Sequence, residues 1–194
     1  MSETNYYKEE TGGRSASNNL FSRNSIELNV NEHLTANSGQ QIIFCGNPSV
    51  ASQLSSSHNI TLVYGGEKPR YQIADTYPAI NKVFKSDVLD FIFFNAAPYL
   101  VIASDTTMLW NHAFQLDKLV KAIERNRYEV AILEFIDEES FEQNLSPNKR
   151  GLFAKESVTR QLKKMLPKYD VQITCTTSAT IPCYTVVIKK RASR

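Results

Sequence analysis

One stretch decides the fold: Gln41-Ile42-Ile43-Phe44-Cys45-Gly46-Asn47-Pro48-Ser49-Val50. Residues 42–45 are apolar without interruption, which is typical of a strand that is buried on both faces of a sheet. Gly46 removes the side chain where the strand ends, Asn47 can cap a helix, and Pro48 suits the first helical position. The pattern predicts a central strand, a tight turn and a helix whose first N–H groups face the carboxyl edge of the sheet. Open α/β folds bind ligands at that edge, although an ordinary turn has the same pattern.

The composition indicates one domain with a sizeable core. The chain has 194 residues, of which 42% are hydrophobic. No apolar run approaches the ~20 residues of a membrane span, and the polar first residues lack a signal-peptide pattern. We therefore expect a cytoplasmic protein that does not contact a membrane. Cys45, Cys175 and Cys183 lack metal-ligand spacing, so we expect no metal site and buried thiols, with a Cys175–Cys183 bridge across a hairpin as the alternative.

Positive charge is concentrated near the C-terminus. Residues 146–194 hold 11 Lys and Arg against 2 Asp and Glu, a net charge of +9, whereas residues 1–145 hold 11 against 18, a net charge of −7. If the basic side chains share one face, they can bind a nucleic acid or an acidic protein surface. The alternative is a solvated helix face and a frayed tail. The residues expected to form the basic face are Lys155, Arg160, Lys163, Lys164, Lys168, Lys189, Lys190 and Arg191.

The pattern of apolar residues divides the rest of the chain into alternating strands and helices. Residues 1–24 are polar and predict a disordered tail, residues 25–190 a single domain, and residues 191–194 a basic tail. Further strands are expected at 60–64, 88–94, 129–136, 169–176 and 183–189, and helices at 25–37, 48–57, 78–84, 106–125 and 155–166, with a loop at 140–151 that could cover the carboxyl edge.

This order of elements predicts an α/β fold. Strands that alternate with helices form a mostly parallel sheet with helices on both faces, and the last two strands read as an antiparallel hairpin. We therefore expect a Rossmann-like three-layer sandwich whose sheet ends in a C-terminal antiparallel hairpin.

Two further segments have the character of site residues. Glu67 follows the second predicted strand, where nucleoside-binding folds place an acid that accepts hydrogen bonds from a ribose, although the glycine-rich segment around it also suits a surface turn. Asn95 follows the predicted strand 88–94 and precedes Pro98 and Tyr99. A polar side chain that a buried strand delivers to the sheet edge is a candidate for ligand contact.

Over residues 26–190, the order of elements resembles that of the class I S-adenosylmethionine-dependent methyltransferases. The resemblance implies that S-adenosylmethionine is the cofactor, that residues 45–48 wrap its methionine part and that Glu67 contacts its ribose. These first-loop residues are Cys45, Gly46, Asn47 and Pro48. It also implies that Asn95, Pro98 and Tyr99 face the methyl acceptor.

The segment from Asn95 to Tyr99 is similar to the Asn-Pro-Pro-Tyr signature of methyltransferases that act on amino groups. The resemblance therefore implies an amino-group acceptor in a nucleic acid or a protein. Here the segment reads Asn95-Ala96-Ala97-Pro98-Tyr99, which is one residue longer and lacks the first proline. The first loop has one glycine where the family has two or three, and residues 65–88 are short for the usual helix, strand and helix. The alternative is a catalytically inactive module of the same fold that serves as a binding or scaffold subunit.

Overall fold

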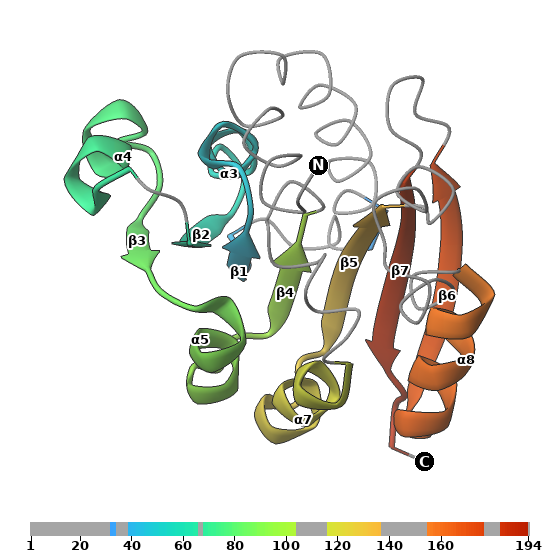
Figure 1. The fold of residues 1–194 in the computed structure, drawn as a ribbon. Helices are drawn as coiled ribbons and strands as arrows, with labels where there is room; N and C mark the ends of the chain where they lie inside the picture. The colour runs from blue at the N-terminus through green and yellow to red at the C-terminus, as the bar shows by residue number, and fades with distance from the viewer. Residues whose placement is uncertain are drawn as a thin grey trace, which may run out of the picture.

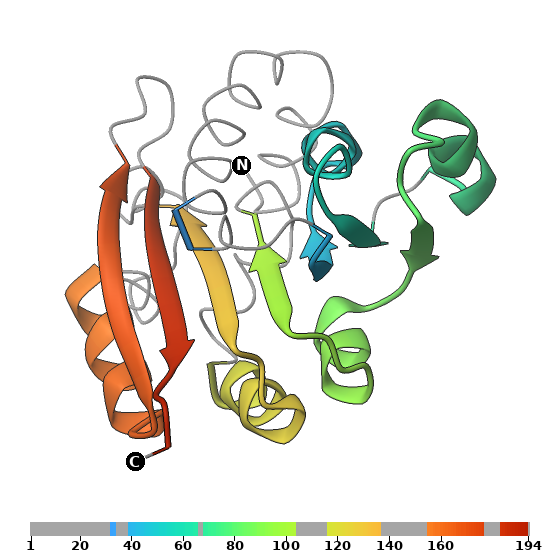
Figure 2. The ribbon, with the colours of Figure 1, turned by 180° about the vertical axis from the view of Figure 1, so that it is seen from behind.

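A seven-stranded sheet forms the centre of the computed structural model, which describes residues 32–33, 39–65, 68–103, 116–136, 155–176 and 183–193. The strand order is β3-β2-β1-β4-β5-β7-β6. Strands β1 to β5 pair in parallel, and β7 pairs antiparallel with both β5 and β6 (Figures 1 and 2). The strands are β1 (Gln41–Cys45), β2 (Asn59–Tyr64), β3 (Lys82–Lys85), β4 (Tyr99–Ile102), β5 (Val130–Ile136), β6 (Tyr169–Thr176) and β7 (Cys183–Lys190).

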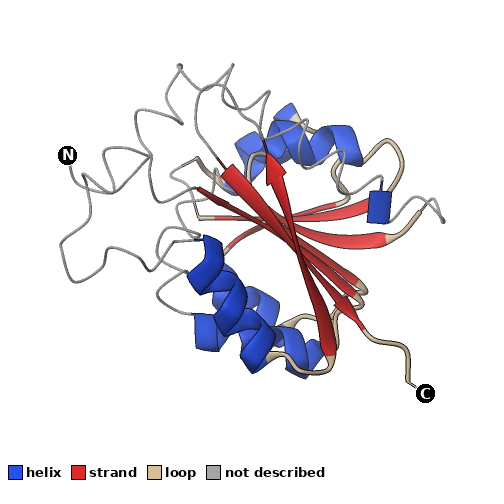
Figure 3. Ribbon diagram, turned by 90° about the vertical axis from the view of Figure 1, so that its right-hand side faces the viewer, coloured by secondary structure: helices blue, strands red, loops and turns tan. Residues whose placement is uncertain are grey.

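Helices cover both faces of this sheet, as Figure 3 shows. Helices α3 (Pro48–Leu54) and α4 (Arg70–Thr76) pack their apolar side chains into one core. Helices α5 (Val88–Phe94), α7 (Leu116–Asn126) and α8 (Lys155–Met165) pack into a second core on the opposite face. The predicted three-layer sandwich with a mostly parallel sheet and an antiparallel C-terminal hairpin is confirmed.

Strand β1 lies inside the sheet, between β2 and β4. Its side chains alternate between the two cores, with Ile43 and Cys45 in one and Ile42 and Phe44 in the other. All four residues are at most 3% exposed. The uninterrupted apolar run therefore predicted a doubly buried strand correctly, because each face needs an apolar side chain at every second position.

Residues 88–94 form helix α5, so the predicted strand at this position is wrong. Asp87 caps the helix, and its Oδ1 accepts a hydrogen bond from the N–H of Asp90 at 3.0 Å. Val88, Leu89 and Ile92 then share the buried side of the helix. A short apolar run has no periodicity that distinguishes a buried strand from a buried helix, and here the cap decides.

The segment before α5 also differs from the prediction. The expected helix at 78–84 is wrong, because this region contains α4 at Arg70–Thr76 and then strand β3 at Lys82–Lys85. Residues 65–88 are thus long enough for the helix and strand that precede α5. Strand β3 lies at the edge of the sheet and has a lysine at each end, a feature of edge strands that discourages further pairing.

Two polar side chains, more than 30 residues further along the sequence, donate hydrogen bonds to the C-terminal end of α5. The hydroxyl of the completely buried Tyr128 shares its one hydrogen between the carbonyls of Ile92, at 3.1 Å, and of Asn95, at 2.8 Å. The Asn126 amide donates to the carbonyls of Ile92 and Phe93. These bonds satisfy carbonyls that a helix end leaves without partners.

Replacing Tyr128 by phenylalanine is therefore expected to destabilise the fold. The ring remains, but the carbonyl of Asn95 loses its hydroxyl donor and that of Ile92 keeps only the Asn126 amide, which costs about 1–3 kcal/mol of unfolding free energy. Urea denaturation of Tyr128→Phe, compared with the exposed Tyr71→Phe, measures this loss. Equal unfolding free energies for the two variants would show that the hydroxyl does not support α5.

The remaining predicted elements fall into two groups. The helix at 155–166 and the strands at 60–64, 129–136, 169–176 and 183–189 are confirmed within one or two residues, and the helix at 48–57 ends earlier, at Leu54. Helix α7 begins at Leu116 in the described part of the chain. The predicted tail 1–24, the loop 140–151 and the start of the helix at 106–125 lie outside the described residues, as does the helix at 25–37 apart from residues 32–33. In the described ranges, no helix combines the length and apolar character needed to cross a membrane.

Candidate functional site

The carboxyl ends of β1 and β4 lie side by side at the point where the strand order reverses. From β1 the chain crosses through α3 to β2, and from β4 it continues through α7 to β5, on the opposite side of the sheet. The N–H of Ala103, just after β4, donates to the carbonyl of Cys45, the last residue of β1, at 2.9 Å. Ligands of open α/β sheets bind in the crevice outside such a reversal point.

The turn that follows β1 is closed by its own hydrogen bonds. The N–H of Ser49 donates to Oδ1 of Asn47 at 2.8 Å, and the N–H groups of Val50 and Ala51 donate to the Asn47 carbonyl. Asn47 thus caps α3 and Pro48 occupies the first helical turn, as predicted. We expected the first N–H groups of this helix to face a ligand. For Ser49, Val50 and Ala51 this expectation is wrong, because their N–H groups already donate hydrogen bonds within the turn.

Cys45 can offer a ligand only its backbone. Its side chain is completely buried in the core formed with α5 and α7, and burial raises the pKa of the thiol far above its ordinary value. A reactive cysteine needs a lowered pKa and some exposure, so the Cys45 thiol has neither property of a nucleophile. Gly46, the next residue, is also buried.

A second acid at the carboxyl edge was missed by sequence reasoning. Asp87 follows the end of β3 and is exposed, while Glu67, the acid predicted to contact a ribose, lies outside the described residues. The sequence contains a pattern that indicates this role. Asp87 precedes a short apolar run and is followed three positions later by Asp90, as at the capped start of a helix. Within the described ranges, no group of three or more His, Cys, Asp and Glu side chains could hold a metal ion.

Solved structures share this fold over almost their whole length. An S-adenosylmethionine-dependent methyltransferase from Clostridium acetobutylicum ATCC 824 is similar with a TM-score of 0.67 and 9% identity, covering 94% of this chain and 96% of that chain. The N-methyltransferase NodS from Bradyrhizobium japonicum WM9 has a TM-score of 0.63 and 11% identity, covering 90% and 98%. The chain has the fold of the class I S-adenosylmethionine-dependent methyltransferases.

A third similar structure, also of a methyltransferase, contains bound ligands. It is the 1,6-didemethyltoxoflavin-N1-methyltransferase from Burkholderia thailandensis with bound 1,6-didemethyltoxoflavin and S-adenosylhomocysteine, with a TM-score of 0.66 and 10% identity, covering 98% of this chain and 87% of that chain. No protein-family model and no curated protein sequence matches the chain. The likeness to this fold is therefore one of backbone architecture.

Asn95, Pro98 and Tyr99 lie at the edge of this methyltransferase fold opposite to Gly46. Tyr99 is the first residue of β4, whereas Gly46 follows the last residue of β1, and the two strands are parallel. The expectation that these three residues follow a strand at the carboxyl edge is wrong, because α5 returns the chain to the amino edge before β4 begins.

The bonds of this segment are structural. The Asn95 amide donates to the Phe91 carbonyl at 2.9 Å and caps the end of α5. The Pro98 carbonyl accepts a hydrogen bond from the N–H of Glu129 at 2.8 Å, and burial, followed by the charge of Glu129, raises the pKa of Tyr99. These contacts join the start of β4 to the start of β5.

The structure brings part of the predicted basic face together at the amino edge of β5. The N–H of Arg191 donates to the Lys168 carbonyl at 3.1 Å, and Lys190 is paired with Tyr169 across the hairpin. The end of α8 supplies two more lysines, so the cluster consists of Lys163, Lys164, Lys168, Lys189, Lys190 and Arg191. Arg191 also bonds Asp170 at 2.7 Å. Lys155 begins α8 and so lies at the far end of that helix, near the opposite edge (Figure 1).

Proposed function

We propose that this chain binds S-adenosylmethionine at the carboxyl ends of β1 and β4 and transfers its methyl group to an acceptor. The observation that carries the proposal is the reversal of strand order between β1 and β4, with the buried Gly46 directly after β1. A strand end without a side chain allows a ligand to approach the backbone closely. The similar structures of the same fold are S-adenosylmethionine-dependent methyltransferases, one of them with S-adenosylhomocysteine bound.

The residues at this edge offer backbone groups and a carboxylate that suit the polar groups of such a cofactor. The backbone of Cys45, Gly46 and Asn47 would border its methionine part, because the N–H groups from Ser49 onward are already used. Asp87 is exposed at the end of β3 and uses one oxygen for its cap, and a carboxylate accepts further hydrogen bonds from hydroxyl or amino groups. Glu67 stays a predicted ribose contact.

Catalysis in such a site would depend mainly on position. S-adenosylmethionine supplies a methyl group on a positively charged sulfur, and transfer requires the acceptor atom to lie in line with the carbon–sulfur bond. Holding both reactants in that geometry supplies much of the rate acceleration. We assign no acceptor class, because the amino-group hypothesis rested on Asn95, Pro98 and Tyr99, and these residues lie at the other edge.

Calorimetric titration tests the proposal. S-adenosylmethionine and S-adenosylhomocysteine are each expected to bind saturably with one site per chain. Tyr99→Phe is expected to bind with the affinity of the natural chain, because Tyr99 is at the amino edge. The absence of heat at millimolar ligand would contradict cofactor binding and favour the inactive scaffold alternative.

We also propose that the basic cluster at the end of the β6–β7 hairpin binds a polyanion such as a nucleic acid. The observation that favours this second function is the convergence of α8, β6 and β7 at one end, where six basic residues lie near Asp170 and Glu129, with Lys189 on the sheet face opposite α8. Each phosphate contact releases a counterion, so affinity for a polyanion depends steeply on salt.

Oligonucleotide affinity, measured at two salt concentrations and in charge-reversed variants of the cluster, tests this second proposal. The affinity for a 20-base oligonucleotide is expected to fall on the order of 10-fold or more between 50 and 200 mM salt, and about 10-fold or more with Lys163→Glu and Lys164→Glu together. The control is Lys121→Glu, which makes the same change of charge on the exposed side of α7. Binding that does not respond to salt, or that Lys121→Glu weakens equally, would argue against this surface.

A further inference from the structure

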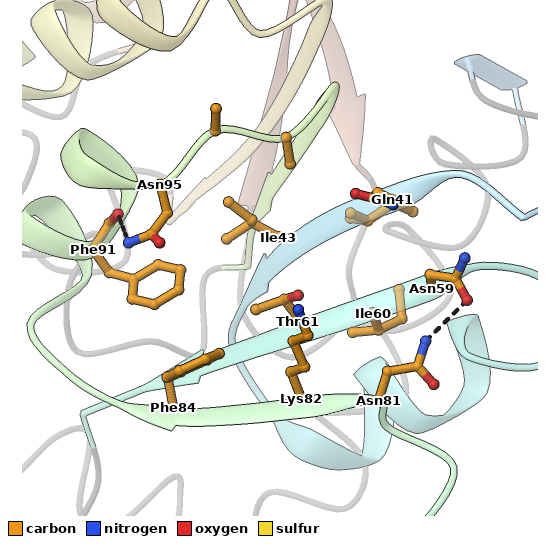
Figure 4. A pocket seen from close by; sticks show the side chains of 13 residues that line it. Gln41, Ile43, Asn59, Ile60, Thr61, Asn81, Lys82, Phe84, Phe91 and Asn95 are labelled. Atoms are coloured by element: carbon orange, nitrogen blue, oxygen red, sulfur yellow. Dashed lines mark hydrogen bonds between the residues drawn. The ribbon is translucent and has the colours of Figure 1, made fainter.

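A pocket of about 310 Å³ opens at the amino edge of β1, β2 and β3, away from the carboxyl edge proposed for the cofactor. It lies on the side of the sheet that faces α5, and its upper wall is the segment that connects α5 to β4 (Figure 4). Its volume is at the lower end of the range for small-molecule sites, which suits a molecule of one or two rings.

Two aromatic rings and an aliphatic side chain form the apolar part of the pocket. The rings of Phe84, on β3, and Phe91, on α5, have their centroids 5.0 Å apart and are tilted by 42°. Ile43, on β1, lies opposite them in Figure 4. Such a wall favours a flat aromatic molecule, because ring faces and edges attract each other at this spacing.

A cation lies beside this apolar wall. Lys82 is exposed and is paired with Thr61 on β2, so both side chains stand on the same side of the sheet. Figure 4 shows the Lys82 side chain extending toward Thr61 along the floor of the pocket. Of the residues that line the pocket, Lys82 alone carries a full charge, so a ligand with a single negative charge would be complementary.

Asn95 presents a hydrogen-bond acceptor on the other side of the pocket. Its Nδ2 donates to the Phe91 carbonyl at 2.9 Å, which fixes the orientation of the amide. Figure 4 shows Oδ1 as the atom that remains toward the pocket. A hydroxyl or amino group on the ligand ring could donate to it.

We propose that this pocket binds a small aromatic carboxylate with a hydrogen-bond donor on its ring. The ring lies against Phe84 and Phe91, the carboxylate contacts Lys82 and Thr61, and the ring donor contacts Asn95. The segment Asn95–Tyr99, which the sequence suggested as acceptor-binding, thus supplies part of a ligand site at the opposite edge of the sheet.

Fluorescence titration with 6-hydroxy-2-naphthoate tests the proposal on the full chain. A ligand of this size with one ion pair is expected to bind with a Kd on the order of 0.1–1 mM. Removing the carboxylate, in 2-naphthol, is expected to weaken binding about 10-fold, and Lys82→Gln is expected to weaken the acid about 10-fold but not the naphthol. Lys121→Gln is the control for a lysine outside the pocket.

The outcomes separate this site from general adsorption and from the cofactor site. Saturable binding that depends on both the carboxylate and Lys82 supports the proposal. Absence of saturation up to the solubility limit, or equal affinities for Lys82→Gln and Lys121→Gln, would overturn it. Titration of Lys82→Gln with S-adenosylmethionine should match the natural chain, so a failure of the cofactor proposal appears in a different measurement.

Discussion

Replacing Gly46 by valine is expected to lower the affinity for S-adenosylmethionine about 100-fold or more. Gly46 directly follows β1, is buried, and stands next to the end of β4. A branched side chain there would occupy the space through which a ligand approaches the backbone, and a loss of close contact over several atoms costs about 3 kcal/mol or more. Among the described glycines the left-handed conformation occurs at Gly39, with φ of 78°, so at Gly46 the effect comes from space and not from backbone strain.

Calorimetry of Gly46→Val measures this effect, with Gly65→Ala as a comparison at a second glycine. A Cβ at Gly65 would meet no atom within 4 Å, so this second glycine variant is expected to keep its fold and to lose less affinity than Gly46→Val. The thermal unfolding midpoint of each variant shows whether lost binding reflects a lost fold. If the natural chain binds S-adenosylmethionine and a folded Gly46→Val variant binds it equally well, the cofactor site lies elsewhere.

Replacing Phe44 by alanine is expected to cost about 3–5 kcal/mol of unfolding free energy, because a large cavity remains in a tightly packed core. Phe44 is in strand β1 and is completely buried among the side chains of the α3 side. The same substitution at Phe94 is expected to cost about 1 kcal/mol or less, because Phe94 is 71% exposed and its aromatic contact is an edge contact with Phe93.

Urea denaturation followed by circular dichroism gives the two unfolding free energies. The ratio of the two costs distinguishes burial from residue type, since both variants remove the same atoms. A similar loss for Phe44→Ala and Phe94→Ala would contradict the position of β1 in the interior of the sheet.

The fold was predictable where several local signals agreed. Strand β1 is apolar from Ile42 to Cys45 and is followed by a glycine, a capping asparagine and a proline, and each of these favours the same structure. The C-terminal hairpin was predictable because β6 and β7 are long and are separated in the sequence by a mostly polar segment. Strand β3 was missed because its four residues, Lys82–Lys85, give too little pattern for any periodicity to emerge.

The candidate site was only half predictable, and a single misassigned element explains the difference. Taking residues 88–94 for a strand places Asn95 at the carboxyl edge, together with Gly46. Because these residues form α5, the chain reaches the amino edge before β4, and every residue from Asn95 to Tyr99 moves to the other side of the sheet. Whether such a segment is a strand or a helix thus decides at which edge of the sheet the following side chains lie.

Strand β7 follows β6 in the sequence but lies between β5 and β6 rather than at the edge of the sheet. During synthesis, β5 and β6 therefore leave the ribosome before the strand that joins them, and both carry open hydrogen-bonding edges in the meantime. Open edges invite pairing with other chains. A chain without Cys183–Lys190 would keep this gap, so the integrity of the sheet depends on this one segment.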